Sequence, residues 1–190
     1  MFTKIVIKET YLTNSFLKIS KIMDLLKSLL LLIFLGCTSI IVAQQKQSLP
    51  NVTAKTLDGQ TINIQDLGTD GKIRVISFWA TWCSPCKKEL DAIADLYPDW
   101  VEEYDMELVA ITIDTRRAVS QVPSLVETKG WEYKILSGTE QDMQSAFNFQ
   151  TIPQTYLIDQ NGEIVYTHNG YLPGDEEELE EKIAALARKK

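Results

Sequence analysis

Two cysteines separated by two residues, Cys83 and Cys86, are the side chains in this sequence best suited to covalent chemistry. They follow an apolar run, residues 74–79, that favours a buried strand, and they precede residues 87–96, whose apolar spacing favours a helix. The first turn of a helix presents unpaired N–H groups and the positive end of the helix dipole, and both favour a thiolate over a thiol. We therefore expect Cys83 to be the attacking sulfur and Cys86 to resolve the mixed disulfide that it forms.

Two other roles for a Cys-x-x-Cys pair fit this sequence less well. A zinc site needs about four ligands, and beyond this pair the sequence offers one cysteine, Cys37, and one histidine, His168. A purely structural disulfide would close so short a loop that it would remove little entropy from the unfolded chain. Pro85, between the two cysteines, suits the first turn of a helix, where a missing N–H has no cost. The pair is therefore predicted to be a reversible dithiol and disulfide, without a metal.

The residues around these cysteines carry a family resemblance. The run Phe78–Lys87, FWATWCSPCK, resembles the active-site segment of the thioredoxin superfamily, and with an exported N-terminus it is most similar to the TlpA/ResA-type thiol-disulfide oxidoreductases. A second segment, residues 151–159 followed by Asn161-Gly162, is similar to the cis-proline loop, strand and hairpin turn of that family. The resemblance extends from about Leu49 onward.

The resemblance implies a substrate-binding surface beside the cysteines. It implies a cis peptide bond before Pro153, with the Ile152 backbone against Cys83, where an extended segment of a substrate protein would form main-chain hydrogen bonds. Trp82 and Pro85 would supply an adjacent apolar rim. The expected site thus has a redox-active disulfide of Cys83 and Cys86 as its catalytic group, and its substrate-binding residues are Trp82, Pro85, Ile152 and Pro153.

Several positions depart from the family pattern. Ser77 stands where many thioredoxins carry a buried acid, and Ser84 stands where some ResA-type proteins carry a glutamate. The proton acceptor for Cys86 is therefore unidentified, and a water or an acid brought near by the fold would have to serve. Residues 89–91 lack the proline of the family's Glu-x-Pro, which predicts a straighter helix. His168 is expected to be a surface residue at the end of a strand rather than a proton shuttle.

These features predict an exported thiol-disulfide oxidoreductase that acts on protein disulfides, in the direction of reduction. The resemblance implies service to cytochrome c maturation or to general disulfide reduction in the periplasm. The expected partners are protein disulfide or dithiol substrates and a membrane electron donor such as a transmembrane thiol reductase. No cofactor and no metal are expected.

Three other functions stay open on the sequence. One is a disulfide-donating oxidase. The reduction potential decides the direction of electron flow, and Ser84 and Pro85 set it jointly with the local electric field, so the sequence alone does not give it. A second is a thiol peroxidase, although Ala80 stands where the peroxiredoxin-like arrangement has Thr or Ser. The third is a non-catalytic peptide-binding module that uses the groove near Pro153.

The order of the remaining segments predicts the fold class. Asp58-Gly59 between two alternating runs, residues 52–56 and 61–64, indicates a small N-terminal hairpin. The run 107–113 is apolar on both faces, which favours a central parallel strand. We expect an α/β protein, a thioredoxin-like sandwich whose mixed central sheet is flanked by helices. Further strands are expected at residues 133–136, 154–158 and 163–167, and helices at 87–104 with a kink or break at Pro98, 120–129, 141–147 and 175–187.

Residues 1–43 are expected to be a targeting segment and residues 44–190 the thioredoxin-like domain. Residues 28–43 are almost wholly apolar, with Lys27 before them and a polar run after them, as in a secretory signal peptide cleaved after Ala43. Two alternatives stay open, a permanent membrane anchor and lipidation at Cys37. Translation is expected to begin at Met23.

The charge follows the same division. Residues 1–43 hold five lysines and two acidic residues, a balance of +3. Because the whole chain has a net charge of −7, the remaining residues carry a net charge of −10. A domain with this excess of acidic residues is not expected to bind nucleic acid or an anionic membrane surface.

Overall fold

The computed structural model describes residues 23, 25–27 and 47–188. The chain divides into two compact units, Met1–Gln45 and Lys46–Lys190. The predicted signal segment, residues 28–43, and the lipidation candidate Cys37 lie outside the described residues. Within the part of the chain that the structure describes, no helix has the length and apolar character needed to cross a membrane.

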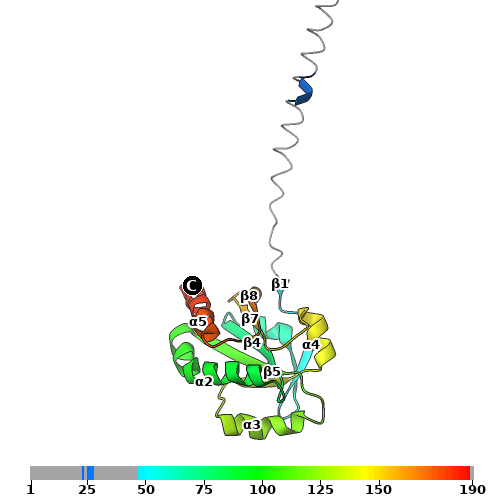
Figure 1. Ribbon diagram of the computed structural model, residues 1–190, viewed down its shortest axis with the longest axis vertical. Coiled ribbons are helices and arrows are strands. Elements are labelled where there is room, and N and C mark those ends of the chain that lie inside the picture. Colours follow the sequence, from blue (N-terminus) through cyan, green and yellow to red (C-terminus); the bar gives the residue numbers. More distant parts are fainter. Residues whose placement is uncertain (1–22, 24, 28–46, 189–190) are drawn as a thin grey trace, which may run out of the picture. The chain divides into compact units, whose positions relative to one another are not determined.

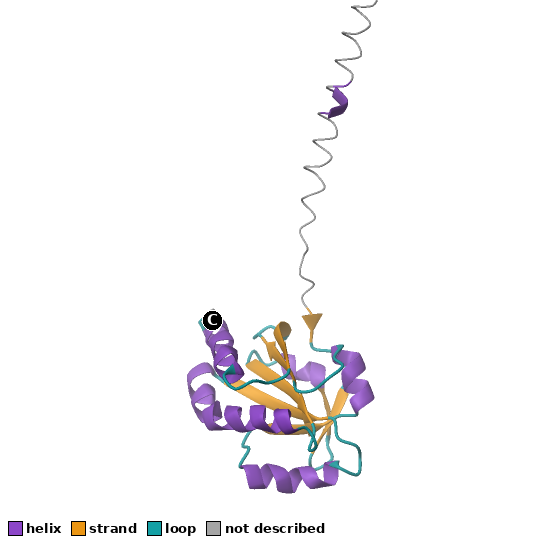
Figure 2. Cartoon of the chain, viewed as in Figure 1, coloured by secondary structure: helices purple, strands orange, loops and turns teal. Residues whose placement is uncertain are grey.

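The second unit is built around one eight-stranded mixed sheet (Figures 1 and 2). Its strand order is β1-β8-β7-β4-β5-β6-β2-β3. The elements are β1 Gln47–Ser48, β2 Thr53–Thr56, β3 Thr61–Asn63, η1 Ile64–Gly68, β4 Ile73–Trp79, α2 Ser84–Tyr104, β5 Met106–Thr112, η2 Val119–Gln121, α3 Val122–Lys129, β6 Lys134–Ser137, α4 Glu140–Phe147, β7 Gln154–Ile158, β8 Glu163–Asn169 and α5 Asp175–Ala187. The predicted thioredoxin-like α/β sandwich is confirmed.

The centre of the sheet is parallel and buried. Strand β5 pairs in parallel with β4 on one side and with β6 on the other. All seven residues of β4 are buried, as its apolar run predicts for a strand covered on both faces. The charged member of that run, Arg74, is buried because it donates to the Leu67 carbonyl oxygen and forms ion pairs with Asp70 and Glu107.

Alternation along β4 directs neighbouring side chains to opposite layers. The Ser77 hydroxyl reaches Glu89 of α2, whereas the Phe78 ring packs against Phe147 of α4 with ring centroids 4.8 Å apart. Successive side chains of a strand point to opposite faces, so α2 and α4 cover different faces of the sheet. Helix α5 lies beside α2, where the Tyr104 hydroxyl donates to Glu180 over 3.1 Å.

The predicted hairpin forms, and it extends the central sheet rather than standing apart. Strands β2 and β3 pair antiparallel around Asp58-Gly59, and β2 also pairs with β6. Helix α2 continues through Pro98 to Tyr104, so the alternative of a break there is wrong. The two-residue strand β1, which the sequence did not predict, pairs with β8 at the opposite edge.

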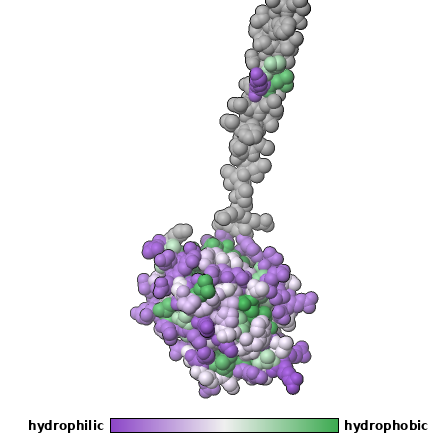
Figure 3. All heavy atoms as spheres, in the orientation of Figure 1, coloured by the Kyte–Doolittle hydropathy of each residue, from purple (hydrophilic) through white to green (hydrophobic). Residues whose placement is uncertain are grey.

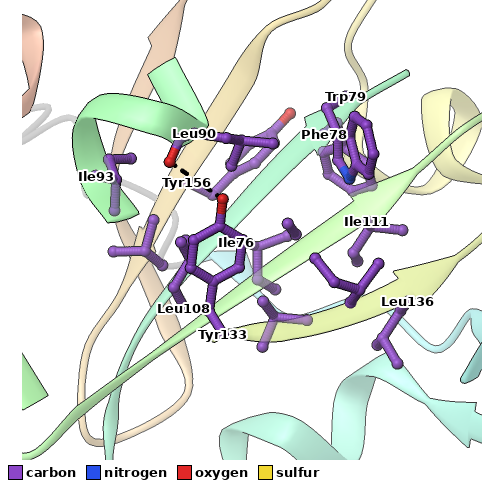
Figure 4. Close-up of a cluster of buried hydrophobic side chains, with 14 of the residues drawn as sticks. Ile76, Phe78, Trp79, Leu90, Ile93, Leu108, Ile111, Tyr133, Leu136 and Tyr156 are labelled. Carbon is purple, nitrogen blue, oxygen red and sulfur yellow. Dashed lines mark hydrogen bonds between the residues drawn. The ribbon is translucent and has the colours of Figure 1, made fainter. Parts of the chain in front are cut away.

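The hydrophobic core lies between the sheet and its helices. Figure 4 shows part of it, including the buried Tyr133, whose hydroxyl donates to the Leu90 carbonyl oxygen over 3.1 Å. On the face of the second unit seen in Figure 3, apolar residues form separate patches among hydrophilic ones. The exposed large apolar side chains nevertheless include Trp82 and Leu172, at 68% and 71% exposure, and Trp82 directly precedes Cys83 of the candidate site described below.

Candidate active site

Cys83 and Cys86 form a disulfide at the point where the chain passes from β4 into α2. Their sulfur atoms are 2.00 Å apart and their Cα atoms 5.4 Å apart. Cys83 is 4% exposed and Cys86 is fully buried. Solvent and substrates therefore meet the pair from the Cys83 side, which agrees with the predicted division of roles between the two sulfurs.

The start of α2 stabilises negative charge on Cys83. This residue is the N-cap of the helix, and its sulfur accepts the backbone N–H of Cys86 over 3.3 Å. Pro85 lies in the first turn, as predicted. In the reduced protein the same N–H group and the helix dipole favour the thiolate form of Cys83.

A buried carboxylate holds the turn that precedes Cys83. Asp114, just beyond the end of β5, accepts hydrogen bonds from the Thr81 backbone N–H over 2.8 Å and from the Thr81 hydroxyl over 2.9 Å. It also accepts the Thr112 hydroxyl over 2.7 Å. On the other side of the turn, Lys87 Nζ donates to the Thr81 carbonyl oxygen over 2.8 Å. Two neighbouring elements thus fix the approach to the disulfide.

The proline loop lies at the same end of the sheet as the disulfide. The Ile152–Pro153 peptide bond is cis, as the family resemblance implied. Gln154 pairs with Phe78, so the loop comes beside the end of β4 from which the Cys83 turn departs. The Pro153 carbonyl oxygen accepts the Gly170 N–H over 2.9 Å, which ties the loop to the segment between β8 and α5.

The predicted substrate-binding side chains differ in exposure. Trp82 is 68% exposed, and Pro85 is also exposed. Ile152 is half-buried against the core and Pro153 is buried. The two exposed side chains can form an apolar rim, whereas Ile152 and Pro153 can offer mainly backbone. The binding roles of these four residues stay predictions.

Glu89 is the acid near Cys86 that sequence reasoning missed. It lies three residues after Cys86 on α2, and both side chains are on the buried face of the helix. Its carboxyl group accepts the Ser77 hydroxyl over 3.0 Å and the Thr155 hydroxyl over 2.7 Å. Burial raises the pKa of Glu89 to about 7, and the two hydroxyl hydrogen bonds oppose that rise.

Glu89 is therefore suited to take up and release a proton near neutral pH. Ser77 stands where many thioredoxins carry a buried acid, and its hydroxyl donates a hydrogen bond to Glu89, an acid that helix α2 supplies. The signal was present in the helical spacing, because Cys86, Glu89, Leu90 and Ile93 recur at the intervals of one helix face.

His168 lies at the end of β8, as the sequence predicted, but it is only partly exposed. Its side chain is 28% exposed, and its Nε2 lies 3.0 Å from Asp175 Oδ2 at the start of α5. It also lines the same small cavity as Glu89. What the sequence did not show is that Asp175 of α5 lies beside this end of β8.

No group of three or more side chains of His, Cys, Asp and Glu within the described ranges is arranged to hold a metal ion. The chemistry that this arrangement supports is thiol-disulfide exchange: a thiolate stabilised at a helix start, a second sulfur in bonding range and a buried acid one turn further on.

Comparisons with known proteins agree with this interpretation. Residues 46–167 match the model of the AhpC/TSA family. The thioredoxin-like protein YneN of Bacillus subtilis is 29% identical over 140 residues, which cover 74% of this chain and 79% of YneN. The thiol-disulfide oxidoreductase ResA of the same organism is 28% identical over 138 residues, covering 73% of each chain.

A solved structure of a thioredoxin-like protein from Porphyromonas gingivalis is 40% identical, with a TM-score of 0.67, and covers 74% of this chain and 92% of that one. The chain therefore belongs to the AhpC/TSA family, as a thioredoxin-like protein of the thiol-disulfide oxidoreductase type.

Proposed function

We propose that this protein reduces protein disulfides outside the cytoplasm through its Cys83–Cys86 pair. The observation that carries the proposal is the pair itself, with Cys83 at the start of α2 and Cys86 buried one turn before Glu89. The direction of electron flow and the export rest on the resemblance to TlpA/ResA-type proteins and on the apolar segment 28–43.

The reaction begins with the reduced protein. The Cys83 thiolate attacks one sulfur of the substrate disulfide, a mixed disulfide forms, and the other substrate sulfur leaves as a thiolate that takes a proton from solvent. Cys86 then gives its proton to the Glu89 carboxylate and attacks the Cys83 sulfur. The second substrate thiolate departs, and two electrons have passed from the protein to the substrate.

Trapping tests the scheme. Without the resolving sulfur, Cys86→Ser should accumulate a mixed disulfide between Cys83 and a disulfide-containing protein, detectable by mass spectrometry after digestion. The matched variant Cys83→Ser should accumulate none, because Cys86 is fully buried. If Cys86→Ser forms no adduct, the proposed exchange is wrong.

The reduction potential tests the direction. A value near or below about −220 mV supports a reductase that receives electrons from a membrane donor such as a transmembrane thiol reductase. A value near about −120 mV would make the protein a disulfide donor instead. Cytochrome c maturation, where haem-attachment thiols must be kept reduced, is the proposed setting for the reductase.

A further inference from the structure

A small cavity with both polar and apolar lining lies where α2, β8 and α5 meet, next to Glu89. Its volume of about 10 Å³ corresponds to about one water molecule. The polar side chains around it come from α2, β7, β8, the segment before α5 and α5 itself; they are Glu89, Thr155, Tyr166, His168, Tyr171, Asp175 and Glu176. Carboxyl, hydroxyl and imidazole groups give a water there several hydrogen-bonding partners.

Glu89 needs such a site, because the proton it takes from Cys86 must leave again. Glu89 is 4% exposed, and the neighbouring sulfurs are no more open, with Cys83 at 4% and Cys86 at 0%. A proton on Glu89 therefore has no direct contact with bulk solvent on the cysteine side. The cavity lies next to the same carboxyl group and leads to partly exposed residues.

Strand register places His168 toward Glu89. His168 of β8 is the direct cross-strand partner of Thr155 in β7, and the Thr155 hydroxyl donates to Glu89 over 2.7 Å. Side chains directly opposite each other in an antiparallel pair lie on one face, with Cβ atoms about 5 Å apart. The imidazole and the carboxyl group therefore face one cavity from two elements.

Asp175 and Tyr166 hold the imidazole ring. Its Nε2 lies 3.0 Å from Asp175 Oδ2, and its Nδ1 lies 3.4 Å from the Tyr166 hydroxyl. The side chains of His168 and Asp175 are 28% and 25% exposed, so the pair reaches solvent. Of the charged groups on α5, Glu176 lines the cavity, and Glu178 and Lys182 contact Tyr166.

We propose that the His168–Asp175 pair, with a water in this cavity, carries the proton of Glu89 to solvent during disulfide exchange. The inference rests on the proposed function. When Cys86 attacks Cys83, its proton goes to the Glu89 carboxylate, from there through the water to the imidazole of His168, and from the imidazole to solvent. No electrons move in this relay. His168 acts through Glu89, so it is a positioning residue rather than a catalytic one.

The test is single-turnover kinetics of the purified, reduced protein with a disulfide-containing peptide, followed by acid quenching. This separates formation of the Cys83 adduct from its resolution by Cys86. A pH-indicator dye in a parallel stopped-flow run follows release of the Glu89 proton after resolution. In His168→Ala this release should be about tenfold slower near neutral pH, whereas adduct formation, resolution and the reduction potential should match those of the unchanged protein. Added imidazole should restore the rate, because a small buffer base can replace the missing ring.

Thr167→Ala is the matched control, since Thr167 is the exposed neighbour on the same strand, and it should behave like the unchanged protein. Proton release at the control rate in His168→Ala overturns the relay. So does a slower release that imidazole does not restore, or one that comes with equally slow adduct formation. If His168→Ala does not fold, Asp175→Asn replaces it, and unslowed proton release there overturns the relay as well. If the unchanged protein forms no adduct, the proposed function fails first.

Discussion

At the scale of single residues, Glu89 is a buried carboxyl group whose pKa is raised toward neutral pH. Glu89 has two hydroxyl partners, Ser77 and Thr155, and burial raises its pKa to about 7 from an ordinary value of 4.5. The folded protein therefore holds a proton on Glu89 in a pH range where the unfolded chain has released it. Between these two values the free energy of unfolding falls as the pH rises, by about 3 kcal/mol in all.

Glu89→Gln should remove this pH dependence. A neutral amide has no proton to lose, so the variant should keep its stability between about pH 4.5 and pH 7, where the unchanged protein loses it. Urea unfolding of the oxidised protein at a series of pH values measures the effect. Glu102→Gln, an exposed change on the same helix, is the control and should follow the unchanged protein. Parallel curves for Glu89→Gln and the unchanged protein would contradict the raised pKa.

The same substitution separates stability from chemistry. Glu89→Gln cannot accept the Cys86 proton, so resolution of the mixed disulfide should slow by about 10²-fold. Attack by Cys83 does not use Glu89 in the proposed scheme and should keep its rate. A variant that is more stable near neutral pH and yet slower in this one step would show that the buried acid is retained for function.

At the scale of elements, Asp114 joins the end of β5 to the turn between β4 and α2. Its carboxylate oxygens are acceptors for three donors, two of them on Thr81. Asp114→Asn places an NH₂ group where a donor already points, which leaves a buried donor unsatisfied at a cost of about 1–3 kcal/mol. Urea unfolding should show that loss. Thr81→Val removes only the hydroxyl donor and keeps the backbone one, so it should cost less; a larger loss in Thr81→Val would contradict this account.

The two hairpin turns offer a second test between elements. Gly59 and Gly162 both have positive φ, 91° and 77°, but their surroundings differ. A Cβ atom on Gly162 would lie 2.7 Å from the Gly68 carbonyl oxygen, whereas one on Gly59 would meet nothing within 4 Å. Gly59→Ala should therefore cost about 1–2 kcal/mol for backbone conformation alone, and Gly162→Ala about 1–3 kcal/mol more for the clash. Equal losses of stability in thermal unfolding would contradict this, because they would show that Gly68 of η1 moves away from the new Cβ atom without a loss of stability.

Local sequence signals predicted most of these elements. The helix at 175–187 and the strand at 154–158 have the predicted bounds, because an acidic first turn and an apolar β-rich run are local features. The association of the β2–β3 hairpin with β6 was not predicted, since pairing between distant strands leaves no local pattern. The roles of Glu89 and His168 were missed for the same reason: each depends on a partner from another element.

At the scale of the whole molecule, the functional groups gather from elements that are distant in sequence but adjacent in the sheet. Strands β4, β5 and β7 supply the turn before Cys83, the Asp114 acceptor and the proline loop, while α2 brings Cys86 and Glu89. Strand β8 and α5 add the cavity on the far side of Glu89. In the proposed scheme the substrate and the proton thus use different routes. The substrate meets Cys83, and the proton that Cys86 gives to Glu89 leaves past His168.

The core that holds these groups together begins at Leu49 and ends at Ile183, and this leads to a prediction about the preceding segment. A chain that starts at Gln44 contains every buried apolar residue of the second unit, so it should fold and unfold cooperatively by itself, which urea unfolding followed by tryptophan fluorescence measures.

Intact mass of the protein recovered from the cell envelope then tests export. Cleavage after Ala43 leaves Gln44 as the first residue and a domain with a net charge of −10, too acidic to be held by an anionic membrane surface. A lipidated Cys37 at the N-terminus, or an uncleaved segment 28–43, would instead tether the active site to the membrane.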